Sequence, residues 1–199
     1  MLSGCNTSFN VAVDAINHPR KPSGTSYRFT SNRPRPGADT RIHSIALAAV
    51  RTALEGRGLF EAPPEATPDM LLDVDYGMGR PLPASGGAPG AVFASRSGML
   101  LGGGGGGVQI VREIFLKLSA REYLPRRAQP RGEELWDIHV SIDAAEAALD
   151  QGLPVLASAA IDYLGENSHI QVVVVLKRNA PDIKFIREGV EAALRAQGS

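Results

Sequence analysis

The chain has 199 residues, and its 21 lysines and arginines balance its 21 aspartates and glutamates. A formal charge of zero lacks the basic excess that binding to a phosphate backbone requires, so nucleic acid is not an expected partner. Hydrophobic residues make up 43% of the chain, but no apolar run approaches the roughly 18 residues of a membrane-spanning helix. We therefore expect one domain built around a single core.

The first predicted feature is a lipid-attachment signal, Leu2-Ser3-Gly4-Cys5. A leucine, two small residues and a cysteine look like a lipobox, which a bacterial signal peptidase cuts before a lipid-modified cysteine. Cys5 is the only cysteine, so no intramolecular disulfide or thiolate metal site uses its sulfur. Only Met1 precedes the tetrad, and the basic and apolar parts of a signal peptide would have to lie upstream of it. The alternative is a chance tetrad in a cytoplasmic protein.

Lipidation at Cys5 would make residues 1–7 a tether and residues 8–199 the folded domain. A diacylglycerol on the sulfur and an N-acyl chain exceed the two anchors that stable membrane residence needs. Asn6 stands where an aspartate would signal retention at the inner membrane. We therefore expect the periplasmic face of the outer membrane, with the inner membrane as the alternative location.

The first part of the domain reads as two strands and a helix. Residues 8–16 alternate apolar and polar side chains, which predicts a half-buried strand. Residues 27–29 predict a second short strand. An apolar stripe at helical spacing follows over residues 42–54, with Asp39 or Thr40 as its N-cap.

The middle of the chain combines strands with glycine-rich connections. Residues 70–76 alternate and predict a strand with one face exposed to water. Residues 77–90 are rich in glycine and proline and predict a loop. Two runs with strand character, 92–101 and 108–119, are joined by the six glycines of 102–107.

The last part of the domain contains the most apolar segment. Residues 121–132 read as a charged connector and 135–142 as a strand. A helix is expected over 154–165, with proline at its first position and glycine at its end. Residues 170–176 are almost continuously β-branched, which predicts a central strand buried on both faces. A final helix is expected over 182–196.

These elements amount to about seven strands and about three helices. The strands occur in adjacent pairs rather than alternating with helices. This order predicts a single α+β domain, with the helices packed on a mixed or antiparallel sheet.

Three residues are candidates for binding. Asp73 and Asp75 fall on the same face of a strand, about 7 Å apart, and would either share a divalent cation or lie solvated on the outer face. Trp136, the only tryptophan, is either a core residue or an exposed binding aromatic.

No pattern typical of an enzyme, a metal centre or a cofactor site occurs in the sequence. The glycines of 102–107 lack the Lys-Ser/Thr of a phosphate-binding loop and lead into a strand instead of a helix. No serine lies in a Gly-x-Ser-x-Gly motif. The histidines lack the spacing of metal ligands; they are His18, His43, His139 and His169.

A family resemblance rests on short segments spread over most of the chain. These are Leu2–Cys5, Phe9–Ile16, Ser26–Phe29, Ala53–Leu59, Pro68–Gly77, Glu134–Trp136, Leu153-Pro154 and Tyr163–Gly165. Together they resemble a family of Gram-negative envelope lipoproteins that share a domain of unknown function. The resemblance implies an α+β module facing the periplasm that contacts other proteins and carries no catalytic residues.

We therefore expect a lipid-anchored domain with a non-enzymatic role in envelope integrity or assembly, acting through protein contacts. The alternative is a small-molecule or peptide binding module whose pocket walls are the segments 77–90 and 120–132. An enzyme would require Asp73, Asp75, His139 or an arginine to converge in one cleft.

Overall fold

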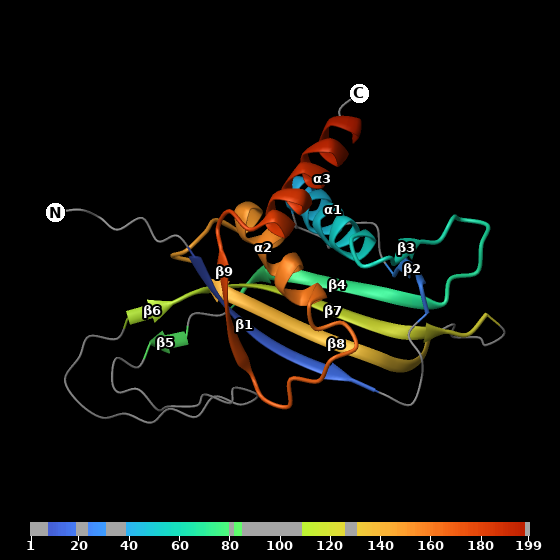
Figure 1. Ribbon diagram of the computed structural model, residues 1–199, viewed down its shortest axis with the longest axis horizontal. Helices are drawn as coiled ribbons and strands as arrows, with labels where there is room; N and C mark the ends of the chain where they lie inside the picture. The colour runs from blue at the N-terminus through green and yellow to red at the C-terminus, as the bar shows by residue number, and fades with distance from the viewer. Residues whose placement is uncertain are drawn as a thin grey trace.

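The computed structural model describes residues 8–18, 24–30, 39–79, 82–84, 109–125 and 131–197. They form one seven-stranded mixed sheet with three helices on one of its faces (Figure 1), which confirms the predicted α+β class. The tetrad with Cys5, the run 92–101 and the glycines 102–107 lie outside the described residues.

The strand order of the large sheet places the first strand near one end and the middle of the chain at its centre. In spatial order the strands are β3 (Phe60–Glu61), β2 (Ser26–Phe29), β4 (Met70–Met78), β7 (Glu113–Tyr123), β8 (Arg131–Asp143), β1 (Ser8–Asn17) and β9 (Val172–Lys177). All neighbours are antiparallel except β2, which pairs parallel with β3 and β4. A separate antiparallel ribbon joins β5 (Leu82–Ala84) to β6 (Gln109–Val111).

Three helices cover one face of the sheet. They are α1 (Thr40–Glu55), α2 (Leu149–Ile161) and α3 (Pro181–Gln197). The Asp39 carboxylate accepts hydrogen bonds from the Arg41 and Ile42 amides, at 2.8 and 3.4 Å, which confirms it as the N-cap of α1. Helix α2 packs on β7 and β8, and α3 packs on α1 and α2. No helix in the described ranges is long and apolar enough to cross a membrane.

The core lies between the helices and the sheet. Alternate side chains of the strands point into it and fill it. Every second residue of β1 is buried from Phe9 to Ala15, and every second residue of β7 from Ile114 to Ala120. The alternate residues point to the other face of the sheet, which the three helices leave open (Figure 1). These two strands therefore have one apolar face, toward the helices, and one mainly polar face.

Hydrogen bonds to the Asp69 side chain hold the start of β2 beside the start of β4. The Asp69 carboxylate accepts hydrogen bonds from the Thr25 amide at 3.0 Å and the Ser26 amide at 2.9 Å, and from the Ser26 hydroxyl at 2.8 Å. These bonds from Ser26 hold the pKa of Asp69 below its ordinary value. A side chain at Gly24 would overlap Asp69, so only glycine fits there.

Several predicted boundaries were wrong because pairing extends strands beyond their apolar pattern. The expected loop 77–90 begins as the end of β4 and contains β5, and the expected connector 121–132 contains the ends of β7 and β8. The run 108–119 is interrupted at Arg112, where β6 leaves for the separate ribbon. Backbone hydrogen bonds to neighbouring strands stabilise these ends whatever their side chains.

The predicted start of the second helix was also wrong. Helix α2 begins at Leu149 and contains Pro154 in its interior instead of at its first position. Proline removes one helical hydrogen bond, but all residues from Gly152 to Ile161 are buried. Burial of this segment outweighs the missing bond.

The segment 170–176 was expected in the middle of the sheet, and this prediction was wrong. Strand β9 lies at the edge, next to β1, and its residues alternate between half-buried and exposed. Val173 and Val175 are 67% and 63% exposed. A β-branched run indicates a strand but not its place in the sheet, and with helices on one face only, the other face of β9 stays open.

Candidate binding site

The open face of the sheet carries a polar hollow of about 470 Å³ above β4, β7 and β8. It is lined by Thr30, Leu71, Asp73, Asp75, Lys117, Ser119, Arg121, Arg131, Gly132, Glu134 and Asp137. Acidic and basic side chains occur in similar number among these residues. The hollow therefore has mixed charge and little apolar surface.

Strand register brings these side chains together. On β4 and β7 the outward residues face each other in pairs: Asp75 lies opposite Lys117, and Asp73 lies opposite Ser119. Ser119 also lies opposite Asp137 on β8. Opposite residues of antiparallel strands stand about 5 Å apart, so one row of the sheet juxtaposes residues far apart in the sequence.

An irregularity in β8 places Glu134 in the hollow. The register with β7 shifts between Ala120, which pairs with Trp136, and Arg121, which pairs with Glu134. Leu135 is the extra residue of this bulge, and Leu135 and Trp136 are both buried although they are adjacent. The bulge thus returns Glu134 to the open face.

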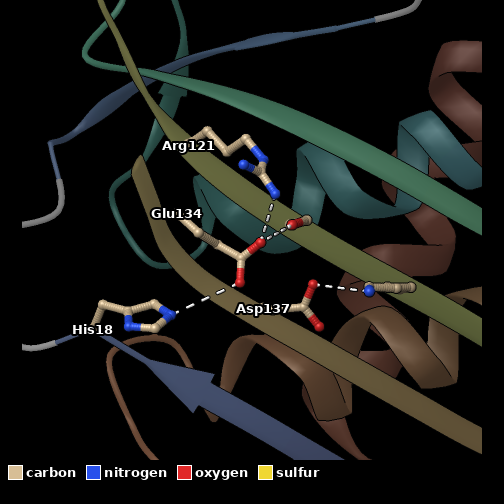
Figure 2. Close-up of polar contacts among 6 residues, drawn as sticks. His18, Arg121, Glu134 and Asp137 are labelled. Atoms are coloured by element: carbon tan, nitrogen blue, oxygen red, sulfur yellow. Dashed lines mark hydrogen bonds and ion pairs between the residues drawn. The ribbon is translucent and has the colours of Figure 1, made fainter. Parts of the chain in front are cut away.

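The Glu134 carboxylate contacts three neighbouring side chains. Its carboxylate lies 2.9 Å from a guanidinium nitrogen of Arg121 and 3.8 Å from Nε2 of His18 (Figure 2). The Ser119 hydroxyl is 3.5 Å from the same carboxylate. Glu134 therefore links β7 to the end of β1.

A second ion pair lies beside it. The Lys117 ammonium is 3.0 Å from the Asp137 carboxylate (Figure 2). Both side chains keep part of their surface in solvent, and so do Arg121 and Glu134. Pairs of this kind contribute little to stability, typically about 0 to 1 kcal/mol, and can exchange partners with a bound charged group at small cost.

Asp73 and Asp75 lie on one face, as predicted, and both line the hollow. Asp73 accepts a hydrogen bond of 2.7 Å from the Thr30 hydroxyl, and Asp75 lies opposite Lys117. Within the described parts of the chain, no three or more histidine, cysteine or acidic residues are arranged to hold a metal ion.

Trp136 is 1% exposed and belongs to the core on the helix-covered face. Its indole is on the opposite side of the sheet from the hollow, so Trp136 is not an exposed binding aromatic. His139 lies on the open face but outside the hollow, where its ring stacks on Phe115 with centroids 5.8 Å apart. The hollow therefore brings Asp73 and Asp75 together with Arg121 and Arg131, but not with His139.

Three charged residues of the hollow, Lys117, Glu134 and Asp137, were missed by sequence reasoning. Lys117 could have been found, because Lys117, Ser119 and Arg121 alternate with the buried residues of the same strand. Glu134 could not, because its orientation depends on the bulge.

No protein-family profile matches the chain, and no curated protein sequence matches it. Among solved structures, it is similar to a PDZ domain protein from Parabacteroides distasonis, with a TM-score of 0.51 and 14% identity over 84% of this chain. The chain spans 39% of that protein's length. A PelC dodecamer from Paraburkholderia phytofirmans has a TM-score of 0.41 and 13% identity over 79% of this chain and 99% of the other. At this identity the first likeness supports the fold alone.

Proposed function

We propose that this chain is a lipid-anchored envelope domain, attached through Cys5 at the periplasmic face of the outer membrane. In this proposal it has a non-enzymatic role in envelope integrity or assembly and acts through protein contacts. The observation that carries the proposal is the tetrad Leu2-Ser3-Gly4-Cys5 directly before the fold. Only Asn6 and Thr7 separate Cys5 from the first residue of β1.

This short spacing has a geometric consequence for the anchored domain. Three residue steps span at most about 10 Å, so a lipid on Cys5 would hold Ser8 close to the bilayer surface. Ser8 pairs with Lys177 at the end of β9. The sheet would then meet the membrane at this end, and its open face would remain accessible to other envelope proteins.

The charges of the open face are suited to contact with a protein. Four charged groups of this face form the partly exposed pairs Arg121–Glu134 and Lys117–Asp137. Such a surface offers complementary charges to a protein partner, and electrostatic complementarity chiefly sets specificity and association rate.

Radiolabelled palmitate tests the anchor in cells that express the full-length gene product. We expect label on the wild-type protein and its complete loss in Cys5→Ser. Ser3→Ala is the matched control, since it keeps a small residue in the tetrad and should keep the label. An unlabelled wild-type protein would end the proposal.

A second candidate function is binding of a peptide or small molecule in the hollow. The observation that favours it is that Arg131 and Gly132, from the predicted wall segment 120–132, line the hollow together with charges of both signs. A ligand that carries both charges could replace the internal ion pairs with pairs of its own.

Chemical-shift mapping with short peptides that carry one acidic and one basic side chain tests this candidate. We expect shifts of the amides around Ser119, at the centre of the hollow, and their loss in Ser119→Trp, which fills it. Asp14→Trp, on the same face but two strands away, should bind as the wild type does. Absence of shifts around Ser119 in the wild type, or equal shifts in both variants, would contradict it.

A further inference from the structure

Strand β9 forms an edge of the large sheet, and of the usual protective features it carries only Lys177, its last residue. Among the described strands it pairs with β1 alone, so no other described strand pairs with the backbone groups of its outer side. From Ile170 to Leu176 the sequence has no charged residue and no proline. Edge strands are normally blunted by lysine, proline, a bulge or short length, because an open edge pairs with other strands.

The opposite edge of the same sheet, strand β3, has several of these protective features. Strand β3 has two residues and is followed by Pro63 and Pro64. Its Glu61 forms an ion pair with Arg51, at 2.7 Å. The chain therefore protects one edge of its sheet and leaves the other open, with the exposed side chains of Val173 and Val175 beside it.

We propose that β9 pairs antiparallel with β9 of a second copy of this chain, about a twofold axis at Val174. In this register Val173 lies opposite Val175 of the second copy on the open face. Val172 lies opposite Leu176 of the second copy on the helix-covered face. Each of these four side chains thus meets an apolar side chain on its own face, which stabilises cross-strand pairing.

Charge favours this register and a second copy as the occupant. Lys177, the only charged residue of β9, lies opposite Gln171 of the second copy, so the two lysines stand at opposite ends of the pairing. A register centred on Val175 would place Lys177 opposite Val173, and one centred on Val173 would leave Val175 opposite Gln171. From Ile170 to Leu176 the edge is uncharged and matches itself, so it needs no complementary charge from another protein.

The pairing leaves the rest of the molecule as described. A twofold axis perpendicular to the sheet keeps the helices of both copies on one side and joins the two sheets into one. The hollow above β4, β7 and β8 stays open, because β1 separates β8 from the edge. This inference is independent of the lipid on Cys5.

Sedimentation equilibrium of the 199-residue chain, without lipid, tests the pairing through two double variants that differ at one residue. In Val173→Lys/Val175→Lys, like charges oppose each other twice across the twofold axis. In Val173→Lys/Val175→Glu, each lysine opposes a glutamate. We expect the wild type to dimerise, and the first variant to dissociate at least about tenfold more readily than the second.

Phe60→Lys is the control, since it introduces the same charge at a half-exposed residue of the other edge and should leave the dimer intact. Circular dichroism of each variant should match the wild type, because the side chains replaced are exposed. A wild type that stays monomeric at about 100 μM, well above a micromolar dissociation constant, would overturn the proposal. So would equal dissociation of the two double variants, which would mean that these residues do not face each other.

Discussion

Replacing Trp136 by alanine is expected to lower the free energy of unfolding by about 3 to 5 kcal/mol. The indole is among the largest fully buried side chains and lies on β8 between Ala120 of β7 and Asn17 of β1. Its removal loses both the transfer free energy of the ring and the contacts of the atoms that line the resulting cavity. Urea-induced unfolding, followed by circular dichroism because the variant lacks the tryptophan, measures the change.

Phe60→Ala is the matched control, because it also removes an aromatic ring but one that is 50% exposed on β3. We expect this variant to lose no more than about 1 kcal/mol. A loss that small for Trp136→Ala would contradict the buried position of Trp136 and restore its interpretation as a surface binding residue.

Replacing Gly189 by alanine is expected to destabilise the protein by about 1 to 3 kcal/mol, although alanine is the better helix former. Gly189 lies where α3 crosses α1, and an added Cβ would overlap the Thr52 side chain and come within 3.0 Å of the Thr52 Cβ. Thr52 is buried, so its side chain has no solvent space to move into. The helices would have to separate, which weakens the packing of α3.

The double variant Thr52→Ala/Gly189→Ala tests this contact by relief of the overlap. The double variant should lose less unfolding free energy than the sum of the losses of the two single variants. Alanine at position 52 removes the two atoms that obstruct the new Cβ. Strictly additive losses in the same urea titrations would show that α3 does not cross α1 at Gly189.

Local patterns predicted the parts of the fold in which one segment determines its own structure. The alternation of residues 8–16 indicated β1, and the side chain of Asp39 before an apolar stripe indicated the start of α1. The place of β9 could not be predicted in this way. A continuous apolar strand is typical of a sheet covered on both faces, whereas here helices cover only one.

The candidate site was predictable in part for the same reason. Asp73 and Asp75 share a face because both lie on one strand, so spacing alone indicated them. Glu134 enters the hollow through the bulge at Leu135, and Lys117 meets Asp137 only through the pairing of β7 with β8. Register between strands depends on the packing of the whole core, which no single segment encodes.

The proposed anchor is tested most directly by the mass of the N-terminal peptide of the protein isolated from cells. The proposal predicts that the peptide begins at Cys5 and carries a diacylglycerol on the sulfur and an acyl chain on the amine, and that it comes from the outer-membrane fraction. A peptide that begins at Met1 with a free Cys5 thiol, recovered from the cytosol, would contradict it.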